Sequence, residues 1–115
     1  MTIKLPWPPS VNSYYRTYKN RTILSAAGRK YKKQAAAAIA AKIKNPPEYK
    51  QRLSVQLYLS PPDNRKRDID NYAKATIDAL QAGRIFLNDS QIDHLEIFRT
   101  ENAKPPHVLA IITPI

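Results

Sequence analysis

Residues 53–59 read Leu-Ser-Val-Gln-Leu-Tyr-Leu, and this stretch alternates apolar and polar side chains without a break. Successive side chains of a strand point to opposite faces, so the pattern predicts a strand with one buried face. Such a strand is stable only when further strands and a covering layer complete the core around it. Pro61-Pro62 marks its end, because proline cannot donate a backbone hydrogen bond.

The flanking sequence supplies both the further strands and the covering layer. We expect strands over residues 2–5, 92–100 and 108–113, and a polar, tyrosine-rich loop over residues 10–22. Helices are expected from the N-cap Ser25 to about residue 43 and over residues 70–82, with Gly83 as the C′ residue. The sequence therefore predicts one α+β domain over residues 1–115, with two helices on a small mixed sheet in the order β-α-β-α-β-β.

The predicted core draws on both helices. Ala73, Ile77 and Leu80 form the apolar stripe of the second helix, and Tyr31 and Ala35 face inward from the first. Trp7, which stands among prolines, is expected to anchor the core.

Composition excludes several classes of protein. The chain has 115 residues, 43% of them hydrophobic, which is enough for one small domain with a packed core. It has no cysteine, so disulfides, iron–sulfur clusters, cysteine-ligated zinc and thiol nucleophiles are excluded. No signal sequence and no membrane-spanning stretch is recognisable, and we expect a cytoplasmic protein.

The charge is high and unevenly distributed. Nineteen Lys and Arg against nine Asp and Glu give a formal charge of +10. Residues 1–67 carry 15 basic and 2 acidic side chains, whereas residues 68–115 carry 4 basic and 7 acidic ones. A cationic half joined to an acidic half indicates a polyanionic partner together with a site that needs carboxylates.

The acidic half begins with a candidate catalytic site. Asp68 and Asp70 are two residues apart at a strand-to-helix transition, so their carboxylates can point the same way. Hard cations such as Mg²⁺ prefer carboxylate and water oxygens. Lys74, one helical turn after Asp70, could reach a phosphate at the metal. Asp89 is the candidate third carboxylate, with Asp93 in reserve.

A purely structural interpretation of these residues remains open. Aspartate at a helix start is a common cap, worth about 0.5–2 kcal/mol, and an Asp–Lys pair at i,i+4 is an ordinary surface pair. Asp78, four residues past Lys74, is expected to hold that lysine in place. His94 and His107 are expected to have structural or surface roles.

The basic half supplies candidate DNA contacts. Residues 65–67 are Arg-Lys-Arg, directly before the acidic pair, and four basic residues open the first helix. Tyr14, Tyr15 and Tyr18 alternate with basic residues, a pattern that suits stacking on exposed bases. The residues assigned to nucleic acid are Asn12, Tyr15, Arg16, Arg29, Lys33, Arg65, Lys66, Arg67 and Asn71.

Three segments together resemble the RusA family of Holliday-junction resolvases. They are Leu5-Pro6-Trp7-Pro8-Pro9-Ser10 with Asn12 and Tyr14-Tyr15-Arg16, then Arg67-Asp68-Ile69-Asp70-Asn71 with Lys74 and Asp78-Ala79-Leu80, then Phe86-Leu87-Asn88-Asp89-Ser90-Gln91-Ile92. The resemblance covers nearly the whole chain. One position departs from the family pattern, since Asn88 stands where the family often has aspartate.

The resemblance implies a homodimeric endodeoxyribonuclease that nicks four-way DNA junctions symmetrically in recombination and repair. It implies that Asp68, Asp70 and Asp89 hold one or two Mg²⁺ ions per subunit, with Mn²⁺ as a substitute, and that Lys74 is catalytic. Arg67 matches a functionally important arginine, and the products would carry 5′-phosphates. We expect no small-molecule cofactor and no membrane partner. A nuclease acting on flaps or forks, or a non-catalytic basic DNA-binding protein, remains an alternative.

Overall fold

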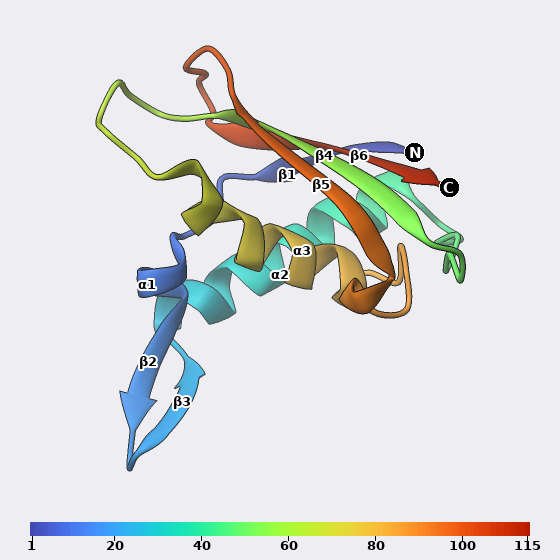
Figure 1. The fold of residues 1–115 in the computed structure, drawn as a ribbon. Coiled ribbons are helices and arrows are strands. Elements are labelled where there is room, and N and C mark those ends of the chain that lie inside the picture. The colour runs from blue at the N-terminus through green and yellow to red at the C-terminus, as the bar shows by residue number, and fades with distance from the viewer.

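The computed structural model describes residues 1–115, and Figure 1 shows the course of the chain. The elements are β1 (Thr2–Pro6), α1 (Val11–Tyr14), β2 (Tyr15–Tyr18), β3 (Arg21–Leu24), α2 (Ala26–Lys42), β4 (Leu53–Ser60), η1 (Ile69–Tyr72), α3 (Ala73–Ala82), η2 (Asp89–Gln91), β5 (Ile92–Arg99) and β6 (His107–Pro114), where η marks a 3₁₀ helix. The α+β class is confirmed, and the expected strands and long helices begin and end within two or three residues of these bounds. No helix combines the length and the hydrophobicity that a membrane crossing requires.

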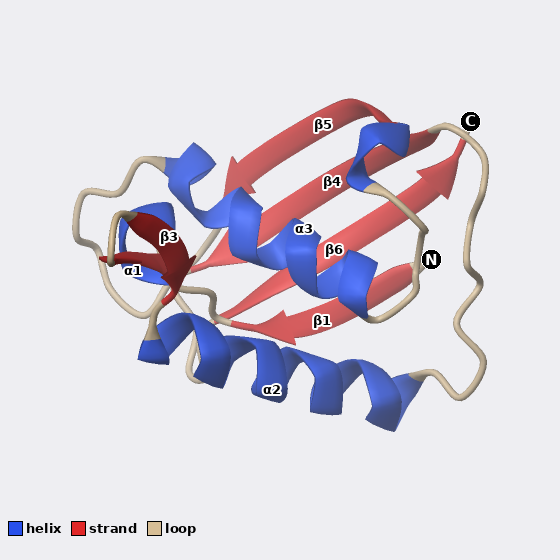
Figure 2. Cartoon of the chain, turned by 90° about the horizontal axis from the view of Figure 1, so that it is seen from below, coloured by secondary structure: helices blue, strands red, loops and turns tan.

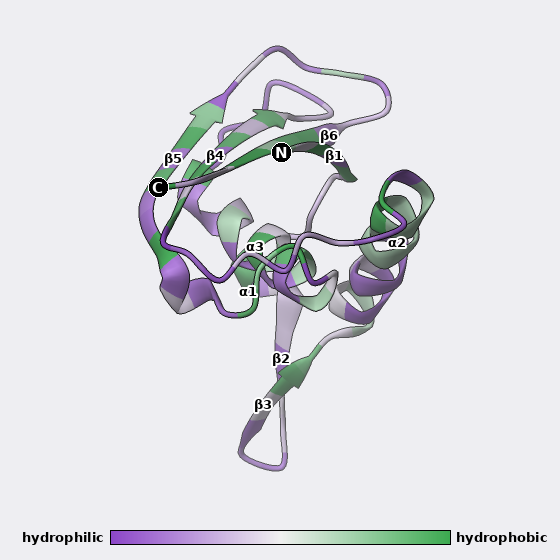
Figure 3. Ribbon diagram, turned by 90° about the vertical axis from the view of Figure 1, so that its right-hand side faces the viewer, coloured by the Kyte–Doolittle hydropathy of each residue, from purple (hydrophilic) through white to green (hydrophobic).

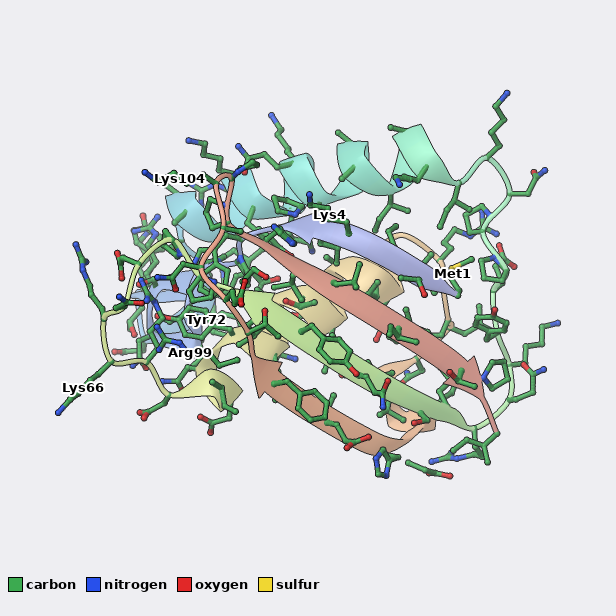
Figure 4. The ribbon with its side chains drawn as sticks, turned by 90° about the horizontal axis from the view of Figure 1, so that it is seen from above. Met1, Lys4, Lys66, Tyr72, Arg99 and Lys104 are labelled. Carbon is green, nitrogen blue, oxygen red and sulfur yellow. The ribbon has the colours of Figure 1, made fainter.

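The main sheet has four strands in the order β1-β6-β4-β5. β6 pairs antiparallel with both β1 and β4, whereas β4 and β5 run parallel. A parallel pair needs a long crossover, and here η1, α3 and η2 form it. α2 and α3 cover one face of the sheet (Figure 2), and the opposite face carries no helix (Figure 4).

The alternation in residues 53–59 places the core as predicted. Leu53, Val55, Leu57 and Leu59 are at most 2% exposed, and the intervening side chains lie half-buried on the open face. Val108, Ala110 and Ile112 of β6 join them, together with Tyr31 and Ala35 from α2. Ala73 and Leu80 of α3 are buried, and Ile77 packs partly buried against them.

The segment 10–22 is not the loop that we expected. It forms α1 and then a hairpin in which β2 and β3 pair antiparallel, with Tyr18 opposite Arg21. Lys19 and Asn20 at the tip both have positive φ, as a two-residue hairpin turn requires. The hairpin extends away from the body of the domain, as Figure 3 shows, and its tip is hydrophilic. In the sequence, this turn is indicated by the pair Lys19-Asn20, which lies between two short runs that contain the β-formers threonine, tyrosine and isoleucine.

The predicted starts and ends of the two long helices are confirmed only in part. Ser25 caps α2 through its side chain, which accepts a hydrogen bond from the Gly28 N–H at 3.0 Å. The second helix begins as the 3₁₀ turn η1, and α3 itself starts at residue 73. Gly83 has φ of −78°, and the left-handed residue is Arg84 instead. A Cβ at residue 83 would lie 2.6 Å from Ile39 Cδ1, so any larger residue there would require the Ile39 side chain to shift.

Candidate active site

Asp68 and Asp70 occupy the start of η1, and both side chains are exposed to solvent. Asp68 is the N-cap residue by position, yet its carboxylate makes no capping hydrogen bond. Neither carboxylate takes part in an ion pair, although the adjacent segment 65–67 is basic. The capping interpretation therefore does not account for this pair of aspartates.

Asp89 lies at the start of η2, beyond the other end of α3. A ten-residue helix is about 15 Å long, so α3 separates η2 from η1. In the single chain no group of three or more acidic or histidine side chains is close enough to hold a metal ion. The carboxylates suit a hard divalent cation by their chemistry, but the isolated chain does not gather all three around one point.

Asn88 explains why the Asp89 carboxylate is free. The Asn88 side chain accepts a hydrogen bond from the Ser90 N–H at 2.8 Å, and the Gln91 side chain accepts one from the Asn88 N–H at 2.8 Å. These two bonds form a capping box, so position 88 has a structural role at the start of η2. Asp89 is not needed as a cap and remains exposed, without an ion pair.

Lys74 lies in the first turn of α3 and meets two acidic residues. Its ammonium lies 3.2 Å from the Asp78 carboxylate, as expected from their spacing. The hydrogen bond to Asp78 raises the pKa of Lys74, and the charge of Asp89 adds to the effect. Lys74 and Asp89 line the same cavity of about 280 Å³, between α3 and β5. The structure therefore brings the candidate lysine together with one candidate carboxylate.

Asp93 lines that cavity too, but it already has a partner. It is the extra residue of a β-bulge, because Ile92 pairs with Leu53 and His94 with Ser54. Its carboxylate accepts a hydrogen bond from Arg52 Nε at 2.9 Å, and this bond lowers the pKa of Asp93. Asp93, the reserve candidate, is thus engaged in a structural ion pair.

The pairing of the acidic residues separates them into two groups. The chain has nine Asp and Glu residues. Four of them form ion pairs with Lys or Arg, namely Glu48, Asp63, Asp78 and Asp93, and Glu96 lies 3.0 Å from His94 and accepts a hydrogen bond from Gln56. Of the remaining four, three are the candidate metal ligands, and the fourth is Glu101 in the loop between β5 and β6.

Two glutamines that the sequence did not single out hold the Asp89 loop in place. Gln91 is 9% exposed, and its side-chain oxygen accepts hydrogen bonds from the N–H groups of Leu87 and Asn88. Its amide nitrogen donates to the carbonyls of Tyr49 and Gln51, at 2.8 and 2.9 Å. Gln81 of α3 accepts a hydrogen bond from the Asp89 N–H at 2.9 Å. The spacing of Asn88 and Gln91, which is that of a capping box, was the signal that the sequence offered for Gln91.

Two of the three basic side chains before η1 are exposed to solvent, and the third is largely buried. Arg65 and Lys66 are exposed, and Lys66 points away from the body of the domain in Figure 4. The Arg67 side chain is only 11% exposed, and it pairs with Asp63 at 2.9 Å. Arg99 of β5 donates to the carbonyls of Asp63 and Arg65, so it fixes the same loop from the other side.

The remaining predicted DNA contacts lie around the hairpin and the start of α2, except for Asn71, which lies in η1. Asn12, Arg16, Arg29 and Lys33 are exposed, whereas Tyr15 and Asn71 are half-buried. The Arg29 guanidinium donates to the Leu24 carbonyl at 2.9 Å, and the Arg16 guanidinium lies over the Tyr18 ring.

Two aromatic residues differ, wholly or in part, from what we expected of them. Tyr14 is not available for stacking because it is 1% exposed, and burial together with the nearby Asp78 carboxylate raises its pKa. Trp7 is only partly buried: it packs against the edge of the core and also lines a cavity, so the expected anchoring role is met in part. Both histidines fit the expected structural roles: His94 lies 3.0 Å from Glu96, and His107 Nδ1 lies 3.0 Å from the Pro105 carbonyl.

Comparison with known proteins assigns the family. The family model described as endodeoxyribonuclease RusA matches residues 6–112. The chain belongs to the RusA family. It is 38% identical over 90 residues to the crossover junction endodeoxyribonuclease rusA of Enterobacteria phage 82, covering 78% of this chain and 74% of that protein. RusA of Escherichia coli strain K12 is 38% identical over 92 residues, covering 79% and 75% of the two chains. The relative from Enterobacteria phage HK97 is 34% identical over 95 residues, covering 83% and 78%.

Proposed function

We propose that this RusA-family chain is a Mg²⁺-dependent endodeoxyribonuclease that resolves four-way DNA junctions by paired symmetric nicks. The relatives are named crossover junction endodeoxyribonucleases, and the family model matches residues 6–112, a range that includes almost all of the three segments that resemble the family. The observation that carries the proposal is the state of Asp68, Asp70 and Asp89. All three carboxylates are exposed and form no ion pair, although the chain has a formal charge of +10. Carboxylates that bind a metal ion must be free of such partners.

Asp68, Asp70 and Asp89 are the residues that would hold the cation, and they would come together around it only in the complex with DNA or a second subunit, because α3 separates Asp89 from the other two in the single chain. Mg²⁺ keeps several waters and is commonly bound by one or two carboxylates together with substrate phosphates. Bound DNA would therefore supply ligands that the isolated chain lacks. The chemistry of the cation would be to polarise the scissile phosphate and to lower the pKa of a bound water, with Mn²⁺ as a substitute.

Lys74 supplies a fixed positive charge beside this site. Asp78 holds its ammonium and favours the protonated form. An ammonium held in this way stabilises the charge that develops on phosphorus during cleavage, without having to move into position. Arg65 and Lys66, exposed on the loop before η1, would bind neighbouring phosphates, whereas Arg67 would stabilise the loop from within.

The proposed enzyme acts as a homodimer. One chain contains one set of candidate catalytic residues, and resolving a junction requires two matching cuts. A dimer with two-fold symmetry presents two such sites, related as the opposed strands of the junction are.

The experiment compares end-labelled four-way junctions, flaps, replication forks and linear duplex, each with Mg²⁺, with Mn²⁺ and with EDTA. We expect paired cuts in opposed strands of the junction that yield 5′-phosphate ends, no cleavage in EDTA, and intact duplex. Equal cleavage of flaps or forks would favour a nuclease with another branched substrate. Tight junction binding without metal-dependent cleavage would identify a non-catalytic DNA-binding protein.

A further inference from the structure

A second cavity, of about 420 Å³, lies where the chain leaves β1 and meets the first half of α2. It is in the size range of small-molecule sites. Three aromatic residues, Trp7, Tyr31 and Tyr72, line it together with the cationic Lys30 and Arg67. None of the proposed metal ligands lines it, so it is distinct from the acidic site.

The aromatic and cationic side chains of the lining contact one another in the chain without a ligand. The Trp7 and Tyr72 rings are 5.0 Å apart between centroids and tilted by 40°. The Arg67 guanidinium lies 5.8 Å from the centre of the Trp7 ring. Asp63 forms an ion pair of 2.9 Å with that guanidinium, which favours its position beside the ring. Tyr31 is buried within α2, and its hydroxyl has no hydrogen-bond partner.

The lining selects a flat, polar-edged and negatively charged occupant. Aromatic and proline side chains favour a planar ring system in the cavity. Gln34 lies in the lining and offers both a donor and an acceptor, as do the hydroxyls of Ser10 and Ser13. The exposed Lys30 supplies a positive charge, and no carboxylate lines the cavity. A nucleobase with its attached phosphate meets all of these conditions.

The position of the cavity connects it to the acidic site. Arg67 and Tyr72 of its lining immediately flank the segment that carries Asp68 and Asp70. Figure 4 shows Tyr72 on the inner side of this segment, toward the body of the domain. A base held in the cavity would therefore leave the phosphates of its own strand next to the two carboxylates.

We propose that this cavity binds one unpaired DNA base at the junction centre and thereby favours branched DNA over duplex. This inference rests on the proposed function. Extruding a base from an intact duplex costs a few kcal/mol, whereas a base that is already unstacked costs least. A junction whose central bases unstack on binding can place one of them in the cavity. Linear duplex can do so only by first extruding a base from its stack, which costs free energy. Specificity for structure then comes from a pocket for a base rather than from reading its sequence.

The chain contains one tryptophan, Trp7, which reports directly on the cavity. We suggest titrating the protein, in EDTA, with single-stranded oligothymidylate and with an abasic strand of equal length. Both strands carry the same phosphates, but only the first carries bases. We expect oligothymidylate to quench Trp7 emission and the abasic strand to leave it nearly unchanged. Equal responses to the two strands would overturn the proposal.

Ala27→Leu tests the cavity by filling it. Ala27 lines the cavity but is exposed on the first turn of α2, so a larger side chain is compatible with folding. We expect at least a tenfold loss of oligothymidylate affinity, roughly the contribution of one stacked base. Ala37→Leu, an exposed alanine of the same helix outside the cavity, is the matched control and should bind normally.

Junction binding supplies the second measurement. Ala27→Leu should reduce the ratio of junction to duplex affinity, while its duplex affinity should match that of Ala37→Leu. Unchanged quenching and an unchanged ratio in Ala27→Leu would overturn the proposal. All of these measurements are made without metal, so they are independent of cleavage. If wild-type protein fails to cut junctions but Trp7 still responds to bases, the proposed activity fails and the base site stands.

Discussion

The Lys74 ammonium lies 3.2 Å from the Asp78 carboxylate, one helical turn further along α3. The same lysine shares its cavity with Asp89, so it faces one carboxylate that holds it and another that is free. Asp78 is itself half-buried, and its carboxylate lies near the buried Tyr14, whose pKa it helps to raise. The pair therefore links the hydrophobic core to the candidate site through one ion pair.

Asp78→Asn should lower the pKa of Lys74, because the hydrogen bond to Asp78 is the main cause that raises it. A lysine is charged below its pKa, so a raised pKa keeps the ammonium charged to higher pH. In Asp78→Asn that charge is lost at lower pH, and Mg²⁺-dependent cleavage should decline earlier on the alkaline side. NMR titration of the lysine side chains measures the shift directly. Glu48→Gln, which removes the partner of Arg84 instead, should leave Lys74 unchanged.

The two glutamines around Asp89 should separate stability from positioning. Gln91→Leu removes four hydrogen bonds in a buried place and should lower the free energy of unfolding by about 2–3 kcal/mol. Gln81→Leu removes one bond, to the Asp89 N–H, and should cost at most about 1 kcal/mol. Even so, Gln81→Leu should slow cleavage, because the backbone that carries Asp89 is no longer held.

Denaturant unfolding and single-turnover cleavage together test this separation. A Gln81→Leu protein that cuts junctions at the wild-type rate would show that Asp89 needs no positioning from α3. A Gln91→Leu protein of unchanged stability would show that water can take the place of the glutamine and satisfy all four of the backbone groups to which it was hydrogen-bonded.

Local patterns in the sequence predicted most of the fold. The alternation from Leu53 to Leu59 reflects the burial of one face of the sheet. The Ser25 cap is a hydrogen bond between the Ser25 hydroxyl and the N–H of the residue three positions later. Both features depend on residues that are close together in the sequence. The hairpin β2–β3 was missed for the opposite reason. Its side chains are half-buried at most, so they show no alternation of apolar and polar residues.

Sequence patterns nominate the individual residues of the candidate site but not their arrangement, and the roles of these residues stay predictions. Asp68, Asp70, Lys74 and Asp89 stand out by chemistry, and their exposure agrees with that assignment. Their arrangement depends on where α3 and the segment after it place Asp89 relative to η1, and the packing of these elements is not readable from local sequence patterns. Gln91 was missed because its carbonyl partners, Tyr49 and Gln51, are 42 and 40 residues away.

The basic hairpin should contribute strongly to DNA affinity and to its dependence on salt. If a dimer neutralises six or more phosphates, the log–log slope of affinity against salt should be about −5 or steeper. Replacing Arg16, Lys19 and Arg21 with glutamine removes three charges from the projecting arm (Figure 3). We expect weaker junction binding and a slope shallower by up to about three per subunit.

Removing the same amount of charge at the far end of α2 provides the control. Lys42, Lys44 and Lys50 lie at the end of that helix and in the segment leading to β4, remote from the hairpin (Figures 1 and 2). If their replacement weakens binding as much as the hairpin variant does, net charge alone decides affinity and the arm has no special role. A slope near zero for the wild-type protein would contradict phosphate binding altogether.

Neutralising the three unpaired carboxylates should abolish chemistry and spare binding. Asp70→Asn keeps the size of the side chain but removes the charge that a metal ion needs, so cleavage in Mg²⁺ should fall by orders of magnitude. Stability should change by no more than about 1 kcal/mol, because the exposed carboxylate makes no hydrogen bond or ion pair within the chain. Junction affinity should hold or rise, because one negative charge facing the phosphates is gone.

Asp68→Asn and Asp89→Asn should behave like Asp70→Asn, although α3 separates residue 89 from the other two in the single chain. Glu101→Gln is the matched control, since Glu101 is also exposed and unpaired but lies in the β5–β6 loop. It should cut normally. The decisive comparison is between binding and single-turnover cleavage of the same four-way junction by all four variants. If Asp89→Asn cuts normally while Asp68→Asn and Asp70→Asn do not, the metal needs only the η1 carboxylates and the DNA. If Asp70→Asn itself cuts at near the wild-type rate, these carboxylates do not hold a catalytic metal, and their exposure has another cause.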